Sequence, residues 1–253
     1  MLKIKNLFYC PVKSVSFTDS KYLNVIKDKG IDNDRIFAFV YNLDLENIKI
    51  FQNNPLSRNL KNFITLKNTP ELNQYNFIFE NDKLTLNKLS DKIITIDPYS
   101  VDEQILLSKE IIKLIKKDKI INFLIDKKNP FFDTMPDNSI SLINKNSIID
   151  FEKKILTKIE FERFRANIYI SGIDAWEERN WLGKIIEINN VKFLVTKEIP
   201  RCSATNLQPN TDKATINLPN KLKKIYDHIN MGVYIVPLNN GKISIEDKII
   251  INV

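Results

Sequence analysis

The sequence predicts a mainly β fold with a few helices, in which a small N-terminal β-barrel domain packs on a second β-barrel domain. Short runs rich in Ile, Phe, Val and Tyr recur through the first hundred residues, separated by turn-forming pairs such as Lys29-Gly30 and Asn81-Asp82. Strands of similar length at short spacing are typical of a small barrel or sandwich. The pair Asp97-Pro98 interrupts this pattern and a helical stretch follows it. We therefore expect a first domain at residues 1–98 and a second at residues 99–253.

The strands of the first domain are predicted from β-branched and aromatic residues, which favour extended backbone. Their expected ranges are Leu2–Tyr9, Tyr22–Lys27, Arg35–Tyr41, Phe63–Lys67, Asn76–Glu80, Lys83–Leu86 and Lys92–Ile96.

The second domain is expected to begin with a helix that Ser100 or Asp102 caps and that continues to about Lys117, because its isoleucines recur on one stripe. Asn144 or Asn146 can cap a second helix. The remaining expected elements are the strands Ser139–Ile143, Arg165–Ser171, Lys184–Asn189, Lys192–Lys197, Gly232–Pro237 and Lys248–Val253, and the helices Ser147–Ile155 and Leu218–Tyr226. The pair Asn189-Asn190 predicts a tight hairpin between two of these strands.

The composition indicates a folded protein of a reducing compartment. Of the 253 residues, 43% are hydrophobic and 27% are charged, which excludes a disordered chain. The two cysteines, Cys10 and Cys202, are too few and too far apart for a disulfide framework or an iron–sulfur cluster. No apolar stretch approaches the ~20 residues of a membrane span, and the N-terminus lacks a signal peptide. We expect a cytoplasmic monomer without membrane contact.

The formal net charge of +7 permits an acidic partner. The lysines are interspersed with Asp and Glu, and no motif for reading RNA or DNA is present. We therefore expect no nucleic-acid partner, and a β-barrel nucleic-acid binder is the weakest of the readings considered.

Cys202 is the strongest candidate for a metal ligand, because of the residues around it. Arg201 precedes it directly, and a neighbouring guanidinium favours the thiolate, the form that binds a metal. A cysteine by itself is more often a small buried hydrophobic residue. The segments around Cys202 indicate a metal ligand instead.

Three segments together resemble one family. The strand FRANIYIS from Phe164, the acidic loop with Trp176 and Trp181, and the strand that ends in Arg201-Cys202 resemble the MOSC domain, named after the C-terminus of molybdenum-cofactor sulfurase. Residues 7–14, LFYCPVKS, followed by Asp34-Arg35, resemble the β-barrel domain that precedes MOSC in the mitochondrial amidoxime-reducing component and its bacterial relatives. Residues 228–234, HINMGVY, are similar to a strand of bacterial members.

The resemblance implies a binding site for the molybdenum cofactor, Mo-molybdopterin. Arginine can bind the cofactor phosphate through two parallel hydrogen bonds, and a soft thiolate suits a sulfur-rich molybdenum centre. Because the matching positions come from both domains, the site is expected at their junction. The implied cofactor-binding residues are Lys13, Ser14, Arg35, Asn144, Arg165, Asn167 and Arg201, with Cys202 as both the catalytic residue and the metal ligand.

Several of these positions have a plainer interpretation. Without the motif, Lys13 and Arg35 would be solvated surface charges. Asn144 stands where relatives often carry Ser or Thr, although an amide can still donate and accept hydrogen bonds. Cys10 lies in an apolar strand and is expected in the core.

Two further sites stay open at this point. His228, the single histidine, is either a packed residue or a proton-handling group near the metal. Glu177 and Glu178 either belong to a loop over the site or form a solvated turn.

The resemblance implies a reductase of small N-hydroxylated substrates such as amidoximes, N-hydroxy bases and hydroxylamines. The chain has no dinucleotide fingerprint and no cluster motif, so we expect a separate electron-transfer protein as partner. The alternative is a molybdenum-cofactor or sulfur carrier without turnover, in which Cys202 delivers the cofactor or holds a persulfide.

Overall fold

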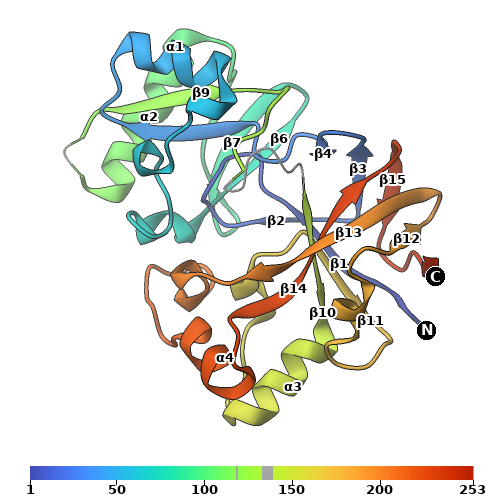
Figure 1. The fold of residues 1–253 in the computed structure, drawn as a ribbon. Helices are drawn as coiled ribbons and strands as arrows, with labels where there is room; N and C mark the ends of the chain where they lie inside the picture. Colours follow the sequence, from blue (N-terminus) through green and yellow to red (C-terminus); the bar gives the residue numbers. More distant parts are fainter. Residues whose placement is uncertain (118, 133–138, 253) are drawn as a thin grey trace.

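The computed structural model describes residues 1–117, 119–132 and 139–252. It is mainly β with a few helices, which confirms the predicted fold class. Figure 1 shows an upper unit, with α1, α2, β6, β7 and β9, beside a lower unit that contains β10 to β14, α3 and α4. The α-helices of the described residues are α1 (Leu45–Asn53), α2 (Val101–Ile115), α3 (Lys145–Ile155) and α4 (Leu218–Tyr226).

The largest sheet dominates the lower unit. Its eight strands run in the order β16 (Ile249–Asn252), β12 (Ile185–Ile188), β13 (Val191–Pro200), β14 (Asn230–Pro237), β10 (Ile140–Asn144), β11 (Ile168–Ser171), β1 (Lys3–Tyr9) and β2 (Thr18–Ser20). An isolated bridge joins Lys3 to Lys248, and the Ile249 amide donates to the Leu2 carbonyl. These contacts bring β1 beside β16, although no continuous ladder closes the sheet within the described residues.

Smaller sheets complete the fold. One contains β15 (Gly241–Ser244), β3 (Tyr22–Ile26) and β4 (Gly30–Ile31); another contains β6 (Tyr75–Glu80), β7 (Lys83–Lys88) and β8 (Asp91–Ile96); a third pairs β5 (Phe37–Tyr41) with β9 (Ile121–Ile125).

Two large hydrophobic clusters form the cores of the two units. The first contains Phe37, Phe77 and Leu107 and extends to Leu207, far along the chain. The second contains Ile4 from β1 together with strands of the C-terminal half. Each core thus takes residues from both ends of the sequence. The predicted division of the chain at residue 98 stays a prediction.

Local signals account for most element boundaries. Asn189, with a φ of 46°, begins the hairpin between β12 and β13, as predicted. Ser100 caps α2 and Asn144 caps α3, each by accepting a backbone N–H at the helix start. The predicted final strand ends at Val253, which lies outside the described residues.

The structure lacks one predicted strand and contains elements that were not predicted. The segment Phe63–Lys67 is not a strand. It contacts β5 through an isolated β-bridge between Phe63 and Val40 and through a hydrogen bond from the Ile64 amide to the Phe39 carbonyl. Helix α1 and strand β9 were not expected. Their short sequences carry weak local signals, and burial of Phe51 and Leu124 in one cluster stabilises both. Across the described residues, no helix combines the length and apolar character that crossing a membrane requires.

Candidate functional site

The loop that follows β1 is hydrogen-bonded to the turn that precedes β5. The Arg35 amide donates to the Cys10 carbonyl over 2.7 Å, and the Lys13 amide donates to the Phe37 carbonyl over 2.8 Å. The buried Asp34 carboxylate accepts the Cys10 amide over 2.7 Å. Ser14 and Arg35 adopt left-handed backbone, with φ of 63° and 56°. Non-glycine residues pay a conformational cost in this region, so the surrounding hydrogen bonds hold a specific loop shape.

Arg35 and Arg165 meet at the ring of Phe17. Their guanidinium carbons lie 5.0 and 4.8 Å from the ring centroid, within cation–π range. Arg165 also donates to the Val15 carbonyl over 2.8 Å, and Arg35 forms an ion pair with Asp34. Burial raises the pKa of the Asp34 carboxyl, while the charge of Arg35 opposes that rise. Two predicted cationic residues from distant parts of the sequence therefore lie on one aromatic ring.

Lys13 lies deeper in the same region. Its side chain is buried, its Nζ donates to the Phe131 carbonyl over 3.1 Å, and it lies 5.7 Å from the centroid of Phe63. Ser14, at the next position, is partly exposed. Lys13 is therefore not a solvated surface lysine.

Arg201 donates to main-chain carbonyls. Its Nε bonds the Met231 carbonyl over 2.9 Å and its Nη1 bonds the Phe164 carbonyl over 2.7 Å. Burial lowers the pKa of Arg201. This side chain ties the end of β13 to β14 and to the residue before Arg165.

Asn167 and Asn144 also hold backbone in place. Asn167 donates to the Phe8 carbonyl over 3.2 Å and accepts from the Ser141 hydroxyl over 2.8 Å. Asn144 donates to the Asp174 carbonyl over 2.7 Å while capping α3. Both side chains are buried. The cofactor contacts predicted for Arg201, Asn167 and Asn144 stay predictions.

The two cysteines occupy opposite environments. Cys202 is exposed, two residues after the end of β13, at the N-cap position of a short 3-10 helix, Ser203–Asn206. Cys10 is fully buried, as expected, and its Sγ donates to the Val12 carbonyl over 2.9 Å. Burial raises the pKa of the Cys10 thiol to about 11. Only Cys202 can meet a ligand or a reagent without rearrangement of the core.

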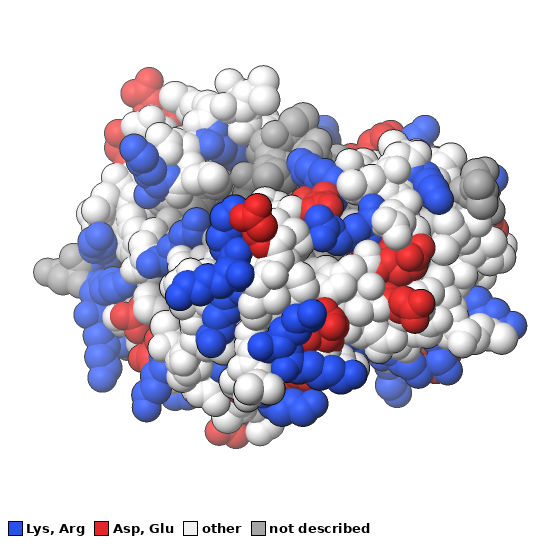
Figure 2. Space-filling model, turned by 60° about the horizontal axis from the view of Figure 1, so that its bottom comes forward, with Lys and Arg blue, Asp and Glu red and all other residues white. Residues whose placement is uncertain are grey.

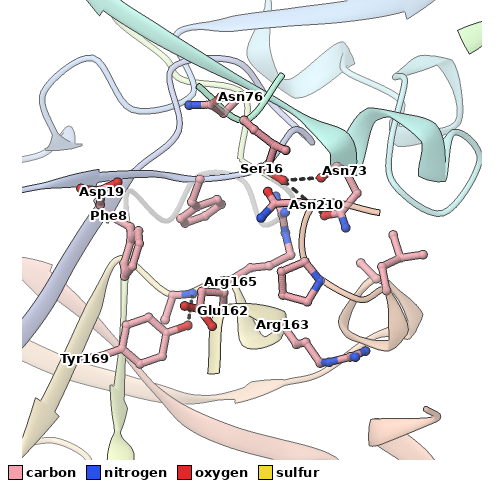
Figure 3. A pocket seen from close by; sticks show the side chains of 16 residues that line it. Phe8, Ser16, Asp19, Asn73, Asn76, Glu162, Arg163, Arg165, Tyr169 and Asn210 are labelled. Carbon is pink, nitrogen blue, oxygen red and sulfur yellow. Dashed lines mark hydrogen bonds between the residues drawn. The ribbon is translucent and has the colours of Figure 1, made fainter. Parts of the chain in front are cut away.

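A cavity of about 250 Å³ opens beside Arg165. Figure 3 shows Arg165 in its middle, with Phe8 and Tyr169 on one side and Asn73 and Asn210 on the other. Two carboxylates, two aromatic rings, three amides and the first turn after Cys202 supply much of its lining: Asp19, Glu162, Phe8, Phe17, Asn73, Asn76, Asn210, Ala204 and Leu207. Sequence reasoning identified only Arg165 among these residues. The others come from segments without a shared motif, although Phe8 and Glu162 adjoin the matched ones.

The wall formed by the loop after Cys202 is held from two sides. The Asn73 amide nitrogen donates to the carbonyls of Gln208 and Thr211, each over 2.8 Å. From the other side, Arg163 donates to the Asn206 carbonyl over 2.9 Å and to the Thr215 hydroxyl over 2.8 Å. These bonds fix the segment that follows Cys202 against both units.

His228 and the acidic loop form a separate cluster. His228 stacks on Tyr226, and its Nε2 lies 2.7 Å from Nη1 of Arg179. Burial and the charge of Arg179 lower the pKa of His228. Glu178 is buried and accepts the Ser147 hydroxyl over 2.9 Å, and burial raises its pKa. Glu177 is partly exposed and accepts a bond from Asn180. Glu178 is therefore not part of a solvated turn, and no described contact joins His228 to Cys202.

Groups of three or more His, Cys, Asp or Glu side chains that could enclose a metal ion do not occur in residues 1–117, 119–132 and 139–252.

The C-terminal part of the chain matches a known protein family. The sequence model of the MOSC domain matches residues 130–250. Mitochondrial amidoxime reducing component 2 of Rattus norvegicus is 36% identical over 77 residues, which are 30% of this chain and 22% of that protein. The Homo sapiens protein of the same name is 35% identical over 65 residues, or 26% and 19% of the two chains. The matches thus span about a fifth of the relatives' length.

Two solved structures share more distant likeness. YuaD from Bacillus subtilis is 13% identical with a TM-score of 0.45, covering 98% of this chain and 94% of that one. YiiM from Geobacillus stearothermophilus is 17% identical with a TM-score of 0.37, covering 45% and 54%. Residues 130–250 are therefore similar to the MOSC domain.

Proposed function

We propose that this protein binds the molybdenum cofactor and, with electrons from a separate partner protein, reduces N-hydroxylated compounds such as amidoximes. A function related to the molybdenum cofactor is supported by the match to the MOSC domain and by the similarity to amidoxime reducing components. We further propose that the protein acts as a monomer in the cytoplasm.

One observation carries it: Arg35 and Arg165 converge on Phe17, next to a cavity that reaches the first turn after Cys202. Two guanidinium groups can bind a phosphate dianion, and their planar forks match its oxygens. The cavity carboxylates of Asp19 and Glu162 can accept N–H groups from the amino-pyrimidine ring of a pterin. The donor set around the cavity therefore fits this cofactor.

In this proposal each residue has a distinct task. Arg35, Arg165 and Lys13 hold the phosphate end, and Phe8 and Phe17 cover the ring system and exclude water. Cys202 supplies the thiolate ligand from an exposed position. When bound, molybdenum supplies the acceptor for the oxygen atom of the N–O bond. Arg201, Asn144 and Asn167 keep their strands in register around the site.

The first test is cofactor occupancy in protein made in a cofactor-competent host. Arg165→Ala should lower molybdenum and pterin per chain about tenfold, because a charged hydrogen bond contributes ~1.5–3 kcal/mol and 1.4 kcal/mol is a factor of ten. Lys113→Ala is the matched control, since its ammonium pairs with Glu110 on the surface of α2. Equal cofactor content in the two variants would place the phosphate elsewhere.

Cys202→Ala separates the metal from the pterin. It should remove molybdenum while the basic residues retain part of the pterin, and Ser203→Ala, at the exposed neighbouring position, should retain both.

The carrier alternative is favoured by one observation, the exposure of Cys202, which a partner protein can reach. Mass spectrometry of the purified protein distinguishes the two functions. A persulfide on Cys202 without turnover of any N-hydroxylated compound would support the carrier, and bound molybdenum with turnover would support the reductase.

A further inference from the structure

Strand β9 lies at the edge of a two-stranded sheet. Its residues pair with β5 on one side, and within the described part of the chain no strand pairs with its other side. Hydrogen bonds from Asn42 to the Ile120 carbonyl and from Asp126 to the Ile36 carbonyl flank the ladder. Since bonded pairs alternate in an antiparallel ladder, the N–H and C=O groups of Ile121 and Phe123 point away from β5.

This edge opens into a groove between two helices. Helix α1 packs on one face of the β5–β9 pair and α2 on the other, as the two clusters around Leu124 and Phe123 show, and α1 lies above β9 in Figure 1. The groove has a volume of about 520 Å³ and takes Ile48 from α1 and Ile105 from α2 into its lining.

The groove exposes apolar side chains and leaves a polar atom unmatched. Ile105 is 47% exposed and Ile120 is 67% exposed. The Asn122 Oδ1 atom is buried and has no hydrogen-bond partner. An unpaired strand edge with apolar flanks is the template onto which an extended peptide adds as a further strand.

The charged residues of the groove favour an acidic binding partner. Among the described residues that line the groove, Lys109 and Lys119 are the charged ones, and none is a carboxylate. A second copy of this chain would bring the same lysines and a net charge of +7 to the contact. An acidic partner meets attraction instead, which favours its association.

We propose that this groove binds an extended, acidic segment of a partner protein, which adds to β9 as a strand. Its backbone pairs with Ile121 and Phe123, its apolar side chains contact Ile105 and Ile120, and its carboxylates face Lys109 and Lys119. The proposal is independent of cofactor binding, because no residue of the cofactor site lines the groove.

Three labelled ten-residue peptides test it by fluorescence anisotropy with the full chain. One alternates valine with aspartate or glutamate, the second replaces the acids by lysine, and the third is the acidic peptide with prolines at its two central valines. The acidic peptide should bind at least about tenfold more tightly than either of the others, since like charges repel and proline removes strand hydrogen bonds. Amide exchange of Ile121 and Phe123, followed by NMR, should slow when it binds.

Charge reversal supplies the matched variants. Lys109→Glu with Lys119→Glu should weaken binding of the acidic peptide about tenfold or more, whereas Lys113→Glu, on α2 outside the groove, should leave it within about twofold. The proposal is overturned if the acidic peptide leaves exchange at Ile121 and Phe123 unchanged, or if the three peptides bind equally. It is also overturned if these amides become protected by raising the concentration of the chain alone, which would assign the edge to a second copy.

Discussion

Cys10 and Cys202 have the same side chain and opposite chemistry. Cys10 belongs to the loop that positions Lys13, and its thiol is enclosed by the carbonyls of Val12 and Val15. Charge on that sulfur would be desolvated, so its pKa rises to about 11 even with Arg35 and Arg165 nearby. Cys202 has no such enclosure. Access to solvent, more than neighbouring charge, distinguishes the two thiols.

Alkylation with iodoacetamide at pH 8 measures this difference in the cofactor-free protein. One thiol per native chain should react quickly, since the thiolate reacts and burial raises the pKa of Cys10 to about 11, well above the pH of the reaction. Both thiols should react in denaturant, and native Cys202→Ala should show no fast phase. Two fast thiols in the native protein would mean that the Cys10 loop opens readily.

At the scale of elements, the segment after Cys202 is a short helix and loop held in place by other segments. Asn73 lies in a 3-10 helix, Pro70–Gln74, of the first unit, and its main-chain carbonyl accepts the Ser16 hydroxyl over 2.6 Å. The side-chain amide of Asn73 donates to the carbonyls of Gln208 and Thr211. One buried amide thus joins the loop after β1 to the loop after Cys202, on two sides of the cavity.

Asn73→Asp tests that connection. A carboxylate cannot donate to two carbonyls, and leaving buried groups unpaired costs about 1–3 kcal/mol each, so the free energy of unfolding should fall. Hydrogen exchange at residues 203–211 should accelerate. Asn76→Asp is the control, because Asn76 lines the same cavity and its side chain donates to the Thr18 hydroxyl. Unchanged exchange in Asn73→Asp would show that Arg163 suffices to hold the loop.

At the scale of the whole molecule, charge and composition bear on the reduction that we propose. Lys and Arg side chains gather across the centre of the face in Figure 2, with Asp and Glu scattered among them. The chain carries +7 and two cysteines, and no dinucleotide-binding turn is present in its sequence. A positive surface attracts an acidic electron donor, at a rate that salt reduces.

Benzamidoxime reduction by cofactor-loaded protein tests the need for a donor. NADH alone should give no turnover, whereas reduced methyl viologen should support it, because an artificial one-electron reductant replaces the missing protein. Turnover with NADH alone would refute the partner requirement. Inactivity with viologen across several N-hydroxylated substrates would favour the carrier.

The sequence by itself determined what local chemistry can specify. Alternating β-branched and aromatic residues indicated most strands, Ser100 and Asn144 began their helices, and Asn189-Asn190 formed the expected hairpin. Each of these signals acts within a few residues. The match to the MOSC domain was visible for the same reason, since its motifs are contiguous.

The tertiary structure decided what depends on distant partners. Helix α1 and strand β9 are stabilised by Phe51 and Leu124, which pack in the same core. No local sequence pattern predicts this contact. The cavity brings Phe8, Asn73, Glu162 and Asn210 together from four separate segments. The hydrogen-bond partners of a polar side chain depend on which segments pack around it. For that reason only the fold could show Arg201 bound to main-chain carbonyls, while Arg35 and Arg165 meet over Phe17.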